Sequence, residues 1–302
     1  MNDMSTSADP SVTEPATPPT VDRPGILTRI LHWMIDDPIA AVALLVLLII
    51  FTCALFADQI APYDPTLQDY ASMLDSPSST HLLGTDDLGR DVFSRLIHGA
   101  SASVYAAVLA VSVATVLGVP VGLIAGYAGG WIDQIISRIL DTFLSFPAIV
   151  LAIAVTGVLG IGLTNAMLSV GIVFAPQLAR LVRARALVLK QELYVEASQC
   201  FGASSGWILM RHILPNAIQP VLVQITLLMA VGLLAEASLS FLGLGMQPPD
   251  PSWGSMIARA YVYAQIAPAQ MYAPGIAILI TALAFNTVGE SLREALDPTS
   301  RN

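Results

Sequence analysis

The stretch that decides the fold reads Glu196-Ala197-Ser198-Gln199-Cys200-Phe201-Gly202, and His212-Ile213-Leu214-Pro215 follows it after nine residues. It forms a polar island between two long apolar segments. Leu193, Ala197 and Phe201 recur at helical spacing, and Gly202 suits the C-terminus of a helix. The pattern predicts a short exposed helix and a glycine elbow within a loop at residues 192–211.

A second helix is expected directly after the elbow. Ser204 or Ser205 can cap a helix that begins near Trp207. From physical chemistry alone, two interpretations of this helix–elbow–helix segment stay open. It is either an ordinary loop helix lying on the membrane surface or a rigid element that passes motion to a partner.

The composition identifies a polytopic membrane protein. Hydrophobic residues make up 55% of the 302 residues and charged residues 12%, as in chains with several membrane spans. The net charge of −9 comes mainly from acids in extramembrane segments. The 13 Lys and Arg residues are spread along the chain, which argues against nucleic acid as a partner.

The chain divides into three predicted parts. Residues 1–28 are rich in Pro, Ser and Thr and are expected to form a disordered cytoplasmic tail. Residues 29–99 are expected to hold the first span and an external amphipathic segment. Residues 100–302 are expected to form the transmembrane core. Cys53 and Cys200 fall on different elements, so no disulfide is predicted.

Uncharged runs predict an all-α protein with six transmembrane helices. The predicted spans are residues 39–57, residues 104–127 with a kink at Gly118–Gly122, two spans between Asp141 and Arg180 joined by a tight turn near 157–165, residues 216–240 and residues 271–291. Six spans place both termini on one side of the membrane.

Lys and Arg residues set the predicted orientation. With both termini in the cytoplasm, only Arg90, Arg95 and Arg259 of the 13 basic residues lie outside, as the positive-inside rule requires. This orientation places the 192–211 loop in the cytoplasm. Residues 58–99 and 241–270 form the two long outer segments.

Residues 81–99 suggest an interfacial helix before the second span. Val92, Phe93, Leu96 and Ile97 share one helical face, opposite the polar residues, among which Asp91 and Arg95 have i,i+4 spacing. The preceding polar residues fit two interpretations. Thr85, Asp86 and Asp87 serve a helix N-terminus, or His81, Asp86 and Asp87 bind a metal, and we favour the helix N-terminus.

The 192–215 segment resembles the coupling loop of binding-protein-dependent ABC importers. The family pattern is Glu-Ala-Ala, three residues, Gly, nine residues, and a short apolar ending in Leu-Pro. The spacing here matches in full, with Ser198 in place of the second alanine and His212 where many members have isoleucine. The resemblance implies that this loop docks onto an ATPase subunit through Glu196, Ala197, Ser198, Gly202, His212, Leu214 and Pro215.

Three further segments resemble the C-type permease of dipeptide, oligopeptide and nickel importers. They are residues 81–99, with Gly-Thr-Asp-x-x-Gly-Arg-Asp, the outer loop 239–254, and the C-terminal end 284–298. The resemblance covers roughly residues 30–300 and implies the type I ABC importer permease fold.

The chain lacks the residues that ATP hydrolysis needs. Lys190 is the only lysine, and its neighbours Leu189 and Gln191 do not belong to a phosphate-binding loop. We therefore expect no catalysis, cofactor or metal on this chain. The resemblance implies ATP and Mg on two partner ATPase subunits, a homologous second permease subunit, an extracytoplasmic solute-binding protein, and a place in the bacterial cytoplasmic membrane.

Four residues are candidates for lining the translocation path. Glu236 is the only acid in the interior of a predicted span, since Glu290 lies one residue from the end of the last one, and intramembrane acids usually face a cavity. It either contacts the ammonium group of a peptide or pairs with a partner subunit. Gln224, Met229 and Asn286 also fit the path, although each equally fits helix packing.

The favoured function is that of an ATP-driven importer permease, with peptides as the default cargo. Longer peptides, nickel chelates and other small solutes are open alternatives to dipeptides. A secondary carrier driven by an ion gradient is the alternative mechanism, and it predicts intramembrane acids or broken helices at corresponding positions in two halves of the chain. Glu236 has no such counterpart.

Overall fold

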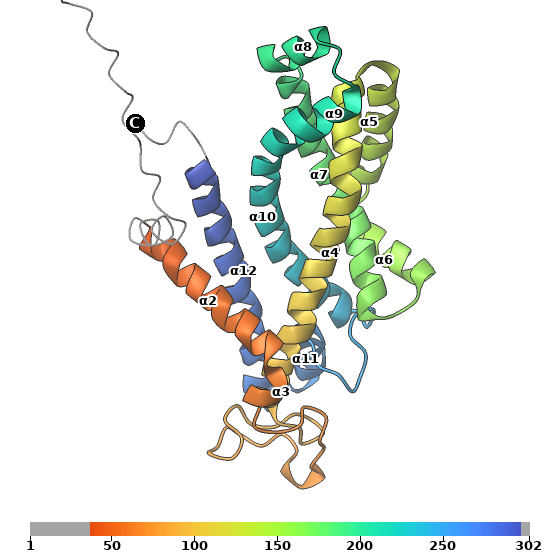
Figure 1. Ribbon diagram of the computed structural model, residues 1–302. Coiled ribbons are helices and arrows are strands. Elements are labelled where there is room, and N and C mark those ends of the chain that lie inside the picture. Colours follow the sequence, from red (N-terminus) through yellow and green to blue (C-terminus); the bar gives the residue numbers. More distant parts are fainter. Residues whose placement is uncertain (1–36, 297–302) are drawn as a thin grey trace, which may run out of the picture. The chain divides into compact units, whose positions relative to one another are not determined.

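The computed structural model describes residues 37–296, whose elements belong to one compact unit that begins at Pro38. Its named elements are all helices (Figure 1). The longer ones are α2 (Pro38–Leu55), α4 (Val92–Ala128), α5 (Gly130–Leu144), α6 (Ala148–Leu159), α7 (Leu163–Leu189), α10 (Leu214–Phe241) and α12 (Ala269–Leu296). The shorter ones are α3 (Ala57–Ile60), α8 (Leu193–Cys200), α9 (Ser205–Ile208), α11 (Trp253–Ala260), the 3₁₀ turns η1 (Tyr70–Ser72) and η3 (Tyr261–Tyr263), and the π-helical turn η2 (Leu209–Ile213). The predicted tail, residues 1–28, lies outside the described residues.

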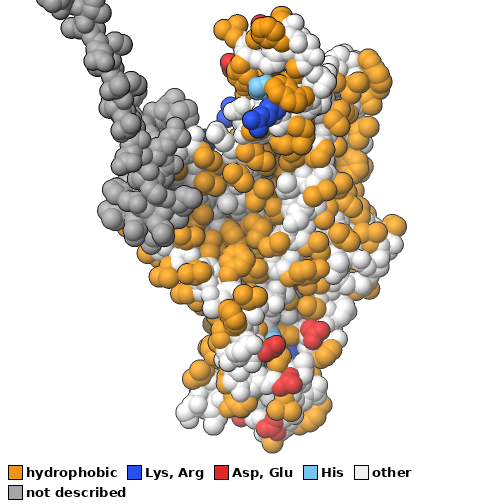
Figure 2. Space-filling model, viewed as in Figure 1, with side chains coloured by type: hydrophobic (Ala, Val, Ile, Leu, Met, Phe, Trp, Pro, Cys, Tyr) orange, Lys and Arg blue, Asp and Glu red, His pale blue; other side chains and the backbone are white. Residues whose placement is uncertain are grey.

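The number of spans agrees with the prediction. Five helical segments are long and apolar enough to cross a membrane: α2, α4, α7, the continuous helix Ser205–Phe241, and α12. The pair α5 and α6 passes the same test together, which gives up to six spans. Hydrophobic side chains cover the middle of the visible surface, as a bilayer requires (Figure 2).

The third predicted span differs from the structure in its start and shape. Sequence reasoning begins it after Asp141, yet α5 begins at Gly130 and is followed by α6 at an angle of 94°. The helix breaks at residues 145–147, where Pro147 disfavours helical backbone in the residue before it. The predicted tight turn to the fourth span is present between α6 and α7.

Ion pairs explain why α5 tolerates charges that the hydropathy pattern excludes. Arg183 of α7 donates to Asp133 through Nη2 at 2.7 Å, and Arg180 of α7 pairs with Asp141. Paired charges are far less costly than isolated ones at the edge of an apolar region. The α5–α7 contact therefore depends on residues 39 to 50 positions apart in sequence.

The predicted interfacial helix before the second span is wrong. Residues 92–99 form the first turns of α4, which runs without interruption for 37 residues. Its N-cap is Asp91, whose carboxylate accepts from the backbone N–H of Ser94 at 2.7 Å, and not Thr85 or its two neighbouring aspartates. The predicted Asp91–Arg95 pair does not form, because Asp91 binds His81 instead.

The core of the unit is the contact between α4 and α7. Gly118, Gly122 and Gly126 form a stripe on α4, where an added Cβ would lie 2.4–2.7 Å from atoms of α7. At Gly122 it would lie 2.4 Å from the carbonyl oxygen of Ala179. Small residues let helices in membranes approach closely and gain van der Waals contact.

A buried ion network closes the end of the unit opposite α8, which we call the loop end (residues 58–91 and 242–268; Figure 1). Asp86 accepts from the backbone N–H of Arg90 at 3.0 Å and from its Nε at 2.7 Å. Arg95 Nε lies 3.5 Å from the same carboxylate. All three side chains are buried, so the Asp86 carboxylate is shared between two buried guanidinium groups, and Asp87 lies 3.8 Å from that of Arg90 as a second acid.

We predict that Gly122→Val destabilises the protein, because its side chain would force α4 away from α7. Overpacking of this kind costs about 1–3 kcal/mol, measurable as a lower melting temperature of the purified protein in detergent. Gly157→Val is the matched control, since an added Cβ there has no neighbour within 4 Å. Equal melting temperatures for the two variants would contradict the close contact.

We predict a larger loss for Asp86→Ala, because it leaves the Arg90 and Arg95 charges buried without their carboxylate. Breaking a buried pair in this way costs about 3–5 kcal/mol. Glu290→Ala removes a carboxylate from the exposed pair with Arg293 and should cost no more than about 1 kcal/mol. Thermal unfolding of both variants tests the difference. A similar loss of stability in both would contradict the stabilising role of the buried Asp86 carboxylate.

Candidate functional site

The predicted exposed helix is present as α8. It spans Leu193–Cys200, and Gly202 follows with φ +81°, a left-handed conformation that favours glycine. The N–H of Gly202 bonds to the carbonyl of Gln199, and the N–H of Ala203 bonds to the carbonyl of Ser198. These bonds end α8 and turn the chain back, as the elbow prediction requires.

The second predicted helix is also present, but it is continuous with the fifth span. The Ser204 hydroxyl accepts from the N–H of Trp207 at 3.4 Å and caps α9. From there the chain stays helical through η2 into α10. In η2 the N–H of Leu214 bonds to the carbonyl of Leu209, a spacing of five residues. Pro215 has no N–H for the carbonyl of Arg211, so the ordinary α-helical pattern cannot hold at this point.

His212 joins α8 to η2. Its Nε2 lies 3.3 Å from the Ser198 hydroxyl oxygen. Its ring centroid is 4.8 Å from that of Trp207 and 5.6 Å from that of Tyr194. Because Tyr194 and Ser198 belong to α8 while Trp207 and His212 follow the elbow, this aromatic group fixes α8 against the helix that enters the membrane.

A single apolar anchor completes the mounting of α8. Val195 is its one buried residue, and it packs in a cluster with residues of α4, α7, α9 and α10. That cluster comprises Val119, Leu123, Leu178, Val182, Ala186, Ile208, Ile213, Ala217 and Val221. Val195 thus attaches α8 to the apolar cluster that these helices form.

The remaining face of α8 is open. Leu193 and Phe201 are 82% and 91% exposed, and Glu196 and Ala197 are exposed beside them. Figure 2 shows hydrophobic side chains gathered at this end of the molecule. Exposed apolar side chains grouped around one acid are typical of a protein-binding surface.

The structure brings together part of the predicted coupling set. Ser198 and His212 are in contact, and Glu196, Ala197 and Gly202 lie on the exposed part of the same segment. Leu214 packs against the cluster beneath α8. Pro215 is the second residue of α10, so these two residues belong to the helix that follows the site and not to its exposed surface.

The four candidate path residues do not form one site. Glu236 is fully buried, and its carboxylate accepts from the Ser103 hydroxyl of α4 at 3.3 Å and from the Ser240 hydroxyl at 2.7 Å. Met229 is buried, Gln224 is half-buried and Asn286 is exposed on α12. Gln224 and Glu236 are twelve residues apart on one helix, or about 18 Å.

Sequence reasoning missed two features of the site. Lys190 Nζ donates to the carbonyl of Tyr127 at 2.7 Å, which ties the start of the loop to the end of α4. The Asp133–Arg183 pair holds α5 against α7 at the same end. Both link residues at least 50 positions apart, so local patterns give no signal for them.

The site shows no chemistry of its own. Within the described residues, no group of three or more His, Cys, Asp or Glu side chains could hold a metal ion. The predicted role of Asp86 and Asp87 at a helix N-terminus is not observed either. Asp86 pairs with Arg90, and Asp87 lies 3.4 Å from Arg259. The arrangement around α8 instead provides an exposed contact surface on a helix that Val195 and His212 attach to the rest of the unit.

Comparisons with known proteins define the class. Residues 118–302 match the family described as "binding-protein-dependent transport system inner membrane component", and this match covers more than half of the chain. The chain belongs to that family of ABC transporter permeases. Residues 31–77 match the "N-terminal TM domain of oligopeptide transport permease C", which confirms the predicted C-type permease.

Individual relatives cover almost all of the chain. A glutathione transport system permease protein of Pectobacterium atrosepticum is 44% identical over 261 residues, 86% of this chain and 87% of the relative. One of Escherichia coli is 46% identical over 260 residues, 86% of each chain. A dipeptide transport system permease protein of Alkalihalophilus pseudofirmus is 39% identical over 295 residues, 96% of each chain.

Solved structures confirm the fold. Two crystal forms of the inward-facing MetNI methionine ABC transporter align with TM-scores of 0.55 and 0.57 at 20% and 21% identity. They cover 67% and 68% of this chain and 96% and 97% of the solved chains. The protein is therefore an inner-membrane permease component that works with ATPase and binding-protein partners and is not itself catalytic.

We predict that His212→Ala loosens α8, because it removes the ring that Tyr194 and Trp207 contact. Amide hydrogen exchange at residues 193–200 should become several-fold faster, since local opening becomes easier. Met210→Ala, in the same π-helical turn but exposed, is the control. Unchanged exchange in His212→Ala would show that Val195 alone fixes α8.

Proposed function

We propose that this chain is a permease subunit of an ATP-driven importer of peptides, and that α8 is the coupling helix on which an ATPase subunit acts. The observation that carries the proposal is the mounting of α8, which exposes Leu193, Glu196 and Phe201 while Val195 and His212 hold it firmly. The names of the relatives, which refer to glutathione and dipeptides, support a peptide cargo.

The connections of α8 support its mechanical role. The short turn at 190–192 joins it to α7, and residues 201–204 join it to the helix Ser205–Phe241. Both neighbours are membrane-spanning helices. A force that displaces α8 therefore acts on α7 and α10 together, without a flexible segment that would absorb it.

The proposed assembly supplies what this chain lacks. A homologous second permease subunit would provide the other half of the translocation path, and two ATPase subunits would bind ATP and Mg. Both termini and α8 would lie on the cytoplasmic side, with the loop end facing an external solute-binding protein. The excess of Lys and Arg on the predicted inner side supports this orientation.

The proposed cycle couples ATP to alternating access. ATP binding would draw the two ATPase subunits together and carry the two coupling helices with them. The spans would then move from an inward-facing to an outward-facing arrangement, and ATP hydrolysis would reset them. Glu196 and Gly202 act in this cycle as a contact and an elbow, with no chemical step of their own.

The experiment that tests the proposal is copurification of the ATPase with the tagged permease from membranes that contain the neighbouring transporter subunits. We expect Glu196→Arg to reduce ATPase recovery at least tenfold, because it reverses the charge at the centre of the exposed face. Gly202→Trp should have a similar effect, because it strains the elbow and places a bulky side chain on the same surface.

Glu290→Arg is the matched control, since it reverses an exposed acid on α12 outside the α8 surface and should leave recovery unchanged. Membrane insertion and monodispersity of each variant are checked in parallel. Full ATPase recovery with both α8 variants would refute the coupling role.

A further inference from the structure

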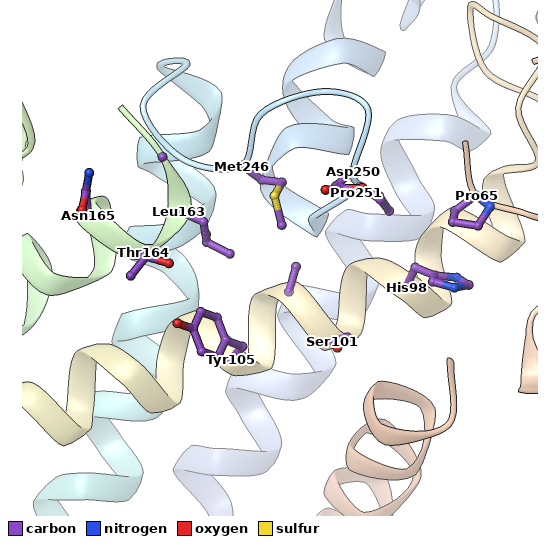
Figure 3. Close-up of a pocket in the computed structure, with 12 residues that line it drawn as sticks. Pro65, His98, Ser101, Tyr105, Leu163, Thr164, Asn165, Met246, Asp250 and Pro251 are labelled. Carbon is purple, nitrogen blue, oxygen red and sulfur yellow. The ribbon is translucent and has the colours of Figure 1, made fainter. Parts of the chain in front are cut away.

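A cavity of about 550 Å³ lies at the loop end, remote from α8 (Figure 3). Its walls come from the start of α4, from the α6–α7 turn with the start of α7, and from the 242–252 segment. The lining residues are Pro65, His98, Ser101, Ala102, Tyr105, Gly162, Leu163, Thr164, Asn165, Met246, Asp250 and Pro251. The volume lies within the range of about 300–1,000 Å³ that is usual for small-ligand sites.

The polar side chains of this cavity have oxygens without partners. Within residues 37–296, no hydrogen bond or ion pair engages the Asp250 carboxylate or the hydroxyls of Ser101, Tyr105 and Thr164. Figure 3 shows Asp250 on one side of the cavity and Tyr105 and Thr164 on another. Glu236 is the opposite case, because serine hydroxyls already occupy both of its oxygens.

The cavity walls are held in place by bonds that do not use those groups. Arg95 Nη1 donates to the carbonyl of Pro65 at 2.6 Å and to the carbonyl of Pro249 at 3.3 Å. The N–H of Gly162 donates to the carbonyl of Leu244 at 3.1 Å. These bonds tie the three walls together, so the cavity does not depend on a ligand for its shape.

Among the described residues, Asp250 is the one unpaired carboxylate at the cavity. It is the only carboxylate among the lining residues, and none of them is Lys or Arg. His98, the lining side chain that can carry positive charge, bonds to the carbonyl of Ser94 and to the Asp58 carboxylate of α3, so that its ring is paired with Asp58. The nearby Arg95 is already bound to backbone carbonyls and faces Asp86.

We propose that this cavity is an outer entry site for the peptide and that Asp250 binds its amino-terminal ammonium group. Ser101, Tyr105 and Thr164 then offer hydroxyls to the peptide's amide groups, while Leu163 and Met246 provide apolar contact. A dipeptide carries one ammonium and one carboxylate, and the one unpaired charge among the lining side chains, that of Asp250, is opposite to that of the ammonium. The peptide therefore enters amino end first.

This inference rests on the proposed peptide cargo, so its test uses the whole transporter. The permease pair, the ATPase subunits and the binding protein are reconstituted in proteoliposomes, and dipeptide uptake is measured against the concentration of peptide-loaded binding protein. We expect Asp250→Asn to lower the maximal uptake rate about tenfold, because the ammonium group loses the opposite charge and keeps only a weaker bond to a neutral amide oxygen. Asp250→Glu should restore most of it, and Tyr105→Phe should cause a smaller loss.

The matched control is Asp75→Asn, an exposed acid of the loop end that does not line the cavity and should keep wild-type uptake. The ATPase subunits should copurify with every variant. Wild-type uptake in Asp250→Asn overturns the entry site. So does a defect that saturating binding protein removes, since it would make Asp250 a docking residue. If the wild-type complex assembles but moves no dipeptide, the proposed cargo fails, and the inference fails with it.

Discussion

The close contact between α4 and α7 is the interaction on which the rest of the structure depends. Each glycine of the α4 stripe costs helix stability, about 0.5–1 kcal/mol relative to alanine, and the gain is van der Waals packing that lipid cannot replace. Through this contact one rod of 37 residues, about 55 Å long, reaches from the entry cavity to the cluster beneath α8. Under the proposed coupling role, a displacement of α8 would move the packed pair together.

Two acids, Glu236 near the loop end and Asp250 within it, differ in whether other side chains of the protein bind their carboxylates. Glu236 is buried and links α10 to α4 through Ser103, while its other oxygen accepts from Ser240 of its own helix, which makes it a structural group in this conformation. Asp250 is exposed at a cavity and has no partner among the described residues. Glu236, which the hydropathy pattern marks as unusual, is thus bound by other side chains of the protein. Asp250, which lies in an ordinary loop, can still bind a ligand.

Sequence patterns predict the features that depend on neighbouring residues, and they miss those that depend on contacts between residues far apart in sequence. The α8 helix, the Gly202 elbow, the Ser204 cap and five of the spans follow from spacing and hydropathy, because each depends on neighbours within a few residues. The start of α5 does not, since Asp133 and Asp141 are tolerated only through arginines on α7. The extent of α4 is equally hidden, because the burial of residues 92–99 depends on loops that fold over them. Asp250 and Tyr105 meet at one cavity although 145 positions separate them.

The π-helical turn before α10 has a consequence for how such permeases are built and exchanged. It holds one more residue than an α-helical turn, and one residue corresponds to about 100° of rotation around a helix axis. The extra residue thus sets the rotation of α10 relative to the loop. With it, His212 faces α8 while Glu236 faces α4. A chimera that joined this α8 loop to a span from a relative with an unbroken α-helix would turn the span by the same angle. The loop and its following span therefore form one module, with its boundaries near residues 190 and 242.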